Sequence, residues 1–203
     1  MASKNVCCPV PTAVASAVTT LNPCPTDIGQ IQKLVFWRAG NSIASEATAL
    51  ISSTWTTLLA ATGSTKAIVT PFLGNPTFEG GEPREFGGGN ETRDGIPHRK
   101  GEEPMQFTAA IQQAAQSVVK TMKDWSCENL EVMFIGEGNQ LFYRLDGSAV
   151  EGFPIRSLFV SSLMPGGFTD DDANQISFYL PPNWSDDGTL SAASTFLLDM
   201  VNS

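Results

Sequence analysis

A long stretch near the middle of the chain, residues 74–104, constrains the possible fold more than any other feature. It is rich in Gly, Pro, Glu, Asp and Arg, and its only large apolar residues are Phe78, Phe86 and Ile96. Such a segment cannot bury a core of its own. Structureless loops of roughly 30 residues are uncommon inside compact domains and are usually functional or disordered. We therefore expect either a flexible surface loop or an arm that becomes ordered against another subunit.

The segments around this loop predict a domain made mainly of β-strands. Apolar or alternating runs bounded by Gly, Pro, Asn or Asp indicate strands at residues 28–37, 66–73, 130–135, 140–145, 153–163 and 175–180. Glycine-containing turns at residues 136–138 and 146–147 separate consecutive strands. The C-terminal strands are therefore expected to form an antiparallel meander.

Two segments predict helices. Residues 45–61 have approximately helical apolar spacing but many Ser and Thr residues, which favour only a short helix. Residues 105–125 predict a longer amphipathic helix, opened by Pro104 after two acidic residues. Its apolar face would comprise Phe107, Ile111, Ala114, Val118, Met122 and Trp125. The expected fold is α+β and mainly β, with an extended N-terminal arm (residues 1–27) and a single domain (residues 28–203).

The residue types that usually carry enzyme chemistry are scarce. The one histidine, His98, lies in the Gly- and Pro-rich loop, where a Ser–His or Cys–His pair would lack a fixed support. The cysteines Cys7, Cys8, Cys24 and Cys127 have neither zinc-motif nor disulfide-framework spacing. Residues 170–174 resemble the start of a calcium loop, but Gln175 stands where such a loop needs glycine. We expect no catalytic residues, metal or cofactor.

The charge balance also excludes one class of partner. The formal net charge is −9, whereas proteins that bind nucleic acid usually present clustered Lys and Arg.

No apolar run reaches the length of about 18 to 20 residues that spans a bilayer. The first residues have neither the charged start nor the apolar stretch of a secretory signal, so synthesis in cytoplasm is expected.

Three short segments of the sequence resemble a known protein family. They are residues 53–62 (STWTTLLAAT), residues 69–72 (VTPF) and residues 180–186 (LPPNWSD). Together they resemble tail tube proteins and related virion proteins of bacteriophages that infect Bacteroidetes, over residues 28 to about 187. The N-terminal arm has no place in that pattern.

The resemblance implies a β-sandwich of two small antiparallel sheets flanked by one helix, in subunits that form rings, usually of six. The rings would stack into a conduit through which DNA passes without specific binding. The chain would be made in the host cytoplasm and would work in the virion, with tape measure, terminator or sheath proteins as further partners. Alternatives are another virion component, such as a connector, terminator or head decoration protein, and a non-viral enzyme or small-ligand binder.

The loop at residues 74–104 would then be the arm that contacts a neighbouring subunit. Phe78 and Phe86 are the expected anchors, because each is a large apolar residue in a segment without a core. Four cations in the loop are expected to pair with acidic surfaces of the adjacent copy: Arg84, Arg93, Arg99 and Lys100.

Overall fold

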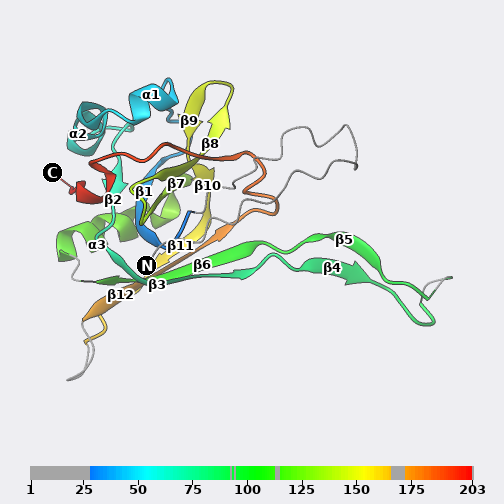
Figure 1. The fold of residues 1–203 in the computed structure, drawn as a ribbon. Coiled ribbons are helices and arrows are strands. Elements are labelled where there is room, and N and C mark those ends of the chain that lie inside the picture. Colours follow the sequence, from blue (N-terminus) through cyan, green and yellow to red (C-terminus); the bar gives the residue numbers. More distant parts are fainter. Residues whose placement is uncertain (1–27, 92, 94, 113–114, 166–171, 203) are drawn as a thin grey trace.

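The structure is a computed structural model that describes residues 28–91, 93, 95–112, 115–165 and 172–202. The expected N-terminal arm, with Cys7, Cys8 and Cys24, lies outside the described residues. The described part is α+β and mainly β, built from antiparallel sheets and few helices, which confirms the expected fold class. Figure 1 shows a body of packed sheets and helices from which a long ribbon of two strands projects.

The larger sheet, sheet A, has seven strands. Its central order is β13-β8-β7-β1-β2, with β9 beside β8 and β10 beside β7. The bounds are β1 Ile31–Arg38, β2 Ile68–Val69, β7 Leu130–Gly136, β8 Leu141–Asp146, β9 Ala149–Glu151, β10 Phe153–Pro154 and β13 Gly188–Leu190. Strands β7, β8 and β9 form a meander joined by turns at the two predicted positions. The run predicted as its third strand, residues 153–163, instead divides into β10 in this sheet and a strand of the second sheet.

Both faces of sheet A are buried, and this explains the unbroken apolar runs in β1 and β7. Along β1, Leu34 and Phe36 face the smaller sheet, whereas Val35 and Trp37 face the helices. All seven residues of β7 are buried, including Glu131. A strand that is buried on both faces has no side exposed to solvent, so its sequence does not alternate between apolar and polar residues.

The smaller sheet, sheet B, has the order β11-β12-β6-β3 and packs on one face of sheet A. Its strands are β3 Leu73–Gly80, β6 Met105–Gln112, β11 Arg156–Val160 and β12 Ala173–Leu180. Strand β12 alternates clearly, with Ile176, Phe178 and Leu180 buried between the sheets. One face of sheet B therefore joins the core and the other faces outward.

Two extended segments pass from one sheet to the other. Strand β2 pairs with β1 in sheet A, and the chain then continues as β3 beside β6 in sheet B. Strand β10 pairs with β7 in sheet A, and the chain continues as β11 beside β12. Strands that switch sheets in this way form the corners of a sandwich.

The predicted helix at residues 105–125 is wrong in its first half. Residues Met105–Gln112 form strand β6, and the helix α3 covers only Gln116–Asp124, followed by a 3-10 turn, η1, at Trp125–Cys127. Phe107 and Ile111 are four residues apart, a spacing that places side chains on one face of a strand as well as of a helix. Val119, Met122 and Trp125 are the buried residues of the true helical part and its turn.

Helices α1 (Glu46–Ala49) and α2 (Ser52–Ala60) cover the second face of sheet A together with the C-terminal residues. They replace the single short helix expected at residues 45–61. The C-terminal segment contains the 3-10 turn η2 (Leu197–Asp199) and is fastened to sheet A by polar contacts. Lys33 Nζ donates to the carbonyl of Met200 at 2.8 Å, and the Asn202 side chain bonds both backbone groups of Val69 on the edge strand β2.

Candidate assembly surfaces

The segment at residues 74–104 forms a β-hairpin arm, so the first of its two expected forms, a flexible surface loop, is wrong, and its contact with another subunit stays a prediction. Beyond β3 and before β6, strands β4 (Pro83–Phe86) and β5 (His98–Glu102) pair with each other as a separate two-stranded sheet. Figure 1 shows this arm projecting away from the body. Backbone hydrogen bonds between two strands need no apolar side chains, so the composition that excluded a core did not exclude a hairpin.

Glycine determines the bend at the base of the arm. Gly80 and Gly81 have φ angles of +99° and +76°, in the region that favours glycine. A Cβ atom at Gly80 would lie 2.6 Å from the carbonyl oxygen of Pro104 on the opposite strand. Just beyond, the backbone amide of Glu103 donates to Glu82 at 2.9 Å. The chain therefore begins a distinct ribbon at residues 81 and 104, which we call the distal arm.

Phe78, predicted as an anchor to a neighbouring subunit, also packs against the body of its own chain. Its ring stacks on Trp184 with centroids 5.8 Å apart and meets the ring of buried Phe107 at 5.0 Å. Phe78 is thus the outermost ring of an aromatic cluster between the sheets, and 38% of it is exposed. A contact between Phe78 and a neighbouring subunit stays a prediction.

Phe86 lies on the distal arm and is 53% exposed. Lys100 places its Nζ 4.2 Å from the centroid of the Phe86 ring, a cation–π contact across the two strands. Ile96, near the tip, is 61% exposed. The distal arm therefore presents large apolar side chains to solvent, accompanied by an ammonium group.

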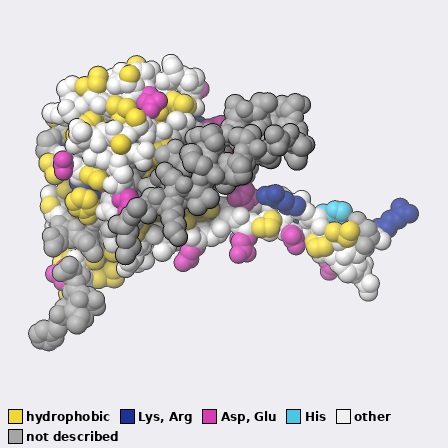
Figure 2. Space-filling model, viewed as in Figure 1, with side chains coloured by type: hydrophobic (Ala, Val, Ile, Leu, Met, Phe, Trp, Pro, Cys, Tyr) yellow, Lys and Arg dark blue, Asp and Glu magenta, His cyan; other side chains and the backbone are white. Residues whose placement is uncertain are grey.

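The remaining predicted contact residues also lie on the arm. Arg84 is 3.6 Å from a carboxylate oxygen of Glu103, and Arg99 is 3.7 Å from one of Glu102. Arg93 is exposed near the tip. Figure 2 shows basic, acidic and apolar side chains interspersed along the arm. Exposed ion pairs of this kind contribute only about 0 to 1 kcal/mol each. Their arginines can therefore leave these carboxylates and pair with acidic groups of another molecule at little cost.

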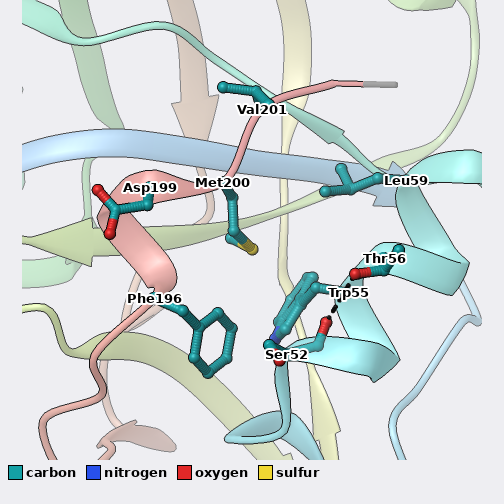
Figure 3. A pocket seen from close by; sticks show the side chains of 8 residues that line it. All are labelled: Ser52, Trp55, Thr56, Leu59, Phe196, Asp199, Met200 and Val201. Carbon is teal, nitrogen blue, oxygen red and sulfur yellow. Dashed lines mark hydrogen bonds between the residues drawn. The ribbon is translucent and has the colours of Figure 1, made fainter.

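A groove lies between α2 and the C-terminal segment, with a volume of about 320 Å³. Figure 3 shows its lining side chains, with Trp55 and Leu59 from α2 facing Phe196 and Met200. Asp199 is exposed at its rim, and Val201 is 73% exposed. We call this hollow the α2 groove. Sequence reasoning missed it, because its two walls are far apart in the chain.

The outward face of sheet B is a second accessible surface. Phe159 of β11 is 58% exposed, and Tyr179 of the neighbouring strand β12 is 40% exposed. Thr77 and Thr108 join their hydroxyl groups at 2.7 Å on the same face. Sheet B also has two edge strands, but Pro76 and a bulge interrupt β3, and a bulge interrupts β11. These devices oppose the addition of a further strand.

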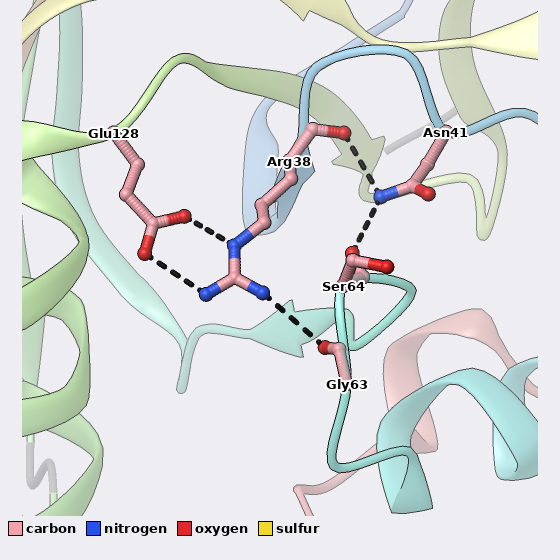
Figure 4. Close-up of polar contacts among 5 residues, drawn as sticks. All are labelled: Arg38, Asn41, Gly63, Ser64 and Glu128. Carbon is pink, nitrogen blue, oxygen red and sulfur yellow. Dashed lines mark hydrogen bonds and ion pairs between the residues drawn. The ribbon is translucent and has the colours of Figure 1, made fainter.

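A polar cluster at the end of β1 is structural. Figure 4 shows Arg38 bound through two nitrogens to the Glu128 carboxylate and through a third to the carbonyl of Gly63. Asn41 links the same strand end to Ser64 at 2.8 Å. The hydrogen bonds from Arg38 lower the pKa of Glu128. The cluster joins β1, the loop after α2 and the turn that precedes β7.

Glu131 is a buried carboxylate in β7. Trp37 Nε1 donates to it at 3.3 Å and the backbone amide of Gly40 at 3.4 Å. Burial raises the pKa of Glu131, and the hydrogen bond from Gly40 opposes that shift. The proton is therefore held more tightly in the folded chain than in the unfolded chain.

Replacing Glu131 by Gln should make stability less dependent on pH. In the natural chain the free energy of unfolding should fall as pH rises above the unfolded pKa of about 4.3 and through the raised folded pKa, because the folded state resists losing the proton. Glu131→Gln cannot titrate, so this loss should disappear in urea titrations carried out at a series of pH values above the unfolded pKa. Glu137→Gln, in an exposed position of the following turn, is the matched control. A slope unchanged by Glu131→Gln would contradict the assignment.

Two features of the sequence bear on catalysis or metal binding, His98 and the calcium-like residues 170–174. His98 is an exposed residue of β5 on the arm. Within the described ranges, no three His, Cys, Asp or Glu side chains lie close enough to hold a metal ion. The calcium-like sequence at residues 170–174 lies partly outside the described residues.

None of the helices in the described part of the chain is long and apolar enough to span a membrane.

Comparison with known proteins yields little. No protein-family profile matches the sequence, and no curated protein matches it. One similar solved chain belongs to the tail of an empty GTA particle with C6 symmetry. The two chains share 12% sequence identity and superpose with a TM-score of 0.31, over 59% of this chain and 79% of that chain. A TM-score this low does not establish a common fold, so the function has to be argued from the residues of this chain.

Proposed function

We propose that this chain is a structural subunit of a bacteriophage tail tube and acts by assembling with copies of itself. The copies form rings, with six in each ring, and the rings stack into a conduit through which DNA leaves the virion. The subunit catalyses no reaction and needs no cofactor. Its further partners are the tape measure, terminator or sheath proteins of the same tail.

The observation that carries this proposal is the distal arm. Its two strands pair only with each other among the described residues, and a two-stranded hairpin alone is at best marginally stable in water. Ordering each residue costs roughly 1 to 2 kcal/mol, and Phe86 and Ile96 recover little of that while they stay exposed. An arm with this composition gains stability by packing on another surface.

The placement of the arm favours a contact that repeats. It leaves one side of the body, whereas α2 and the C-terminal segment lie toward the other side (Figure 1). An arm that binds a different face of the next copy makes a heterologous contact, and such contacts generate closed rings or open helical filaments. In this proposal Arg84, Phe86, Arg93, Arg99 and Lys100 contact the neighbour directly, and Phe78 supports the base of the arm.

Association should increase with protein concentration. Sedimentation velocity of the purified full chain, over a wide concentration range and at two salt concentrations, should show discrete species much larger than the 21.7 kDa subunit. High salt should weaken the charge contacts and leave the apolar ones. A monomer under every condition would contradict the proposal.

Duplex DNA should bind this chain poorly. The net charge of −9 repels phosphate at long range, and a conduit has to let DNA slide without holding it. Fluorescence anisotropy with a labelled duplex at moderate salt should detect no submicromolar binding by either the subunit or the assembled form. Tight binding under these conditions would rule out the conduit, although it would leave self-assembly possible.

A further inference from the structure

The α2 groove and the Phe86–Lys100 pair complement each other in apolar character and charge. The groove is walled by Trp55, Leu59, Phe196 and Met200 and carries the Asp199 carboxylate at its rim. The arm carries an exposed aromatic ring with an ammonium group 4.2 Å from its centroid. We propose that Phe86 of one copy docks into the α2 groove of the next copy, with Lys100 beside Asp199. This inference rests on the proposed self-assembly and names the receiving surface.

The size of the groove fits one aromatic side chain. A cavity of about 150 Å³ lined by apolar side chains holds benzene. The α2 groove, at about 320 Å³, has room for the Phe86 ring and for part of the Lys100 methylene chain. Aromatic side chains that enter well-packed pockets often dominate the affinity of an interface.

The charges favour the arm over an uncharged or acidic occupant. Asp199 is exposed and interacts electrostatically with the Lys33 ammonium, whose hydrogen bond goes to the carbonyl of Met200, so the outer side of the carboxylate is open to a second cation. A docked ring would bring the Lys100 ammonium to a rim that carries a carboxylate. The cation would retain its contact with the Phe86 ring and gain an opposite charge, and partial burial of the pair strengthens both interactions.

The position of the groove also fits a repeating contact. Its walls come from α2 and the residues around η2 (Figure 3), and these elements lie on the side of the body away from the arm (Figure 1). Because donor and acceptor surfaces differ, each copy has one arm to give and one groove to fill. The contact can therefore continue from copy to copy around a ring.

Site-specific photocrosslinking tests the docking site in the full chain. Phe86 is replaced by p-benzoylphenylalanine, and equal amounts of nitrogen-15-labelled and unlabelled protein are mixed before assembly and illumination. Peptide mapping by mass spectrometry should find mixed-label crosslinks from residue 86 to residues 52–59 or 196–201. Mixed-label crosslinks only to other positions would overturn the groove and retain self-assembly, and crosslinks only within one copy would overturn the groove as well. Failure of the natural chain to associate would overturn both proposals.

A charge cycle gives an independent readout if the photocrosslinking residue disturbs assembly. Lys100→Met and Asp199→Asn should each weaken association by about two- to fivefold, the range for a partly exposed ion pair. The double variant should be no weaker than the weaker single variant, because both changes remove the same contact. Thermal unfolding of the dilute subunits checks that each variant is folded. Fully additive losses would overturn the pairing of Lys100 with Asp199.

Discussion

Removal of residues 82–103 should leave a folded chain that no longer assembles. In this variant Gly81 is joined to Pro104 through a short Gly-Ser turn, at the point where the distal arm begins. The body keeps its core, because Phe78, Phe107 and Trp184 lie outside the deletion. Loss of the whole arm should weaken association by at least about 100-fold, since each hot-spot residue of an interface contributes about 2 kcal/mol or more.

Two measurements make this result decisive. A cooperative thermal transition should show that the shortened subunit is folded, and sedimentation should show it as a monomer where the natural chain associates. A smaller deletion, residues 89–95, removes the tip and Arg93 but keeps Phe86 and Lys100, so it should still associate, with a loss no larger than that of one exposed ion pair. If the chain without residues 82–103 assembles normally, the arm is not the assembly element; if it does not fold, the arm belongs to the core.

Phe134→Ala should cause the largest loss of stability of any single substitution considered for this chain. Phe134 is fully buried at the centre of the core between the sheets. Its ring centroid lies 5.6 to 6.5 Å from those of Phe78, Phe107, Phe142, Phe153, Phe178 and Trp184. The cavity left by alanine should lower the free energy of unfolding by about 3 to 5 kcal/mol, measured by urea titration of the dilute subunit.

The controls separate burial from aromatic character. Phe134→Leu keeps more of the volume and should cost less than the alanine variant. Phe159→Ala removes a ring that is 58% exposed on the outward face of sheet B, and it should change stability by no more than about 0.5 kcal/mol. Equal losses for Phe134→Ala and Phe159→Ala would contradict the placement of the core.

The sequence predicted most strands correctly because their signals are local. Strands β1, β7, β8 and β12 coincide with apolar or alternating runs that end at turn residues. Strand β6 was predicted as the first half of a helix because Phe107 and Ile111 are spaced four apart, which suits both periods. Only the pairing of β6 with β3 and β12, across the whole length of the strand, decides between them. That pairing is a tertiary contact and leaves no local mark in the sequence.

The functional roles of the arm and the α2 groove also depend on tertiary contacts that the local sequence does not reveal. Composition identified residues 74–104 as unable to form a core, and it indicated Phe86 as an exposed anchor. It did not distinguish Phe86 from Phe78, because the partner that holds Phe78 is Trp184, more than a hundred positions away. The groove joins α2 to residues near the C-terminus across a comparable separation. A tryptophan in a Ser- and Thr-rich helix was the one available sign of a packed surface there.

Electron microscopy of the purified full chain at high concentration tests the central claim most directly. The account predicts rings with a central opening, with six copies in each ring, that stack into tubes, and it predicts that the same preparation of the chain lacking residues 82–103 contains neither. Single subunits or irregular aggregates in place of rings and tubes, from a chain that is folded by its thermal transition, would contradict the account.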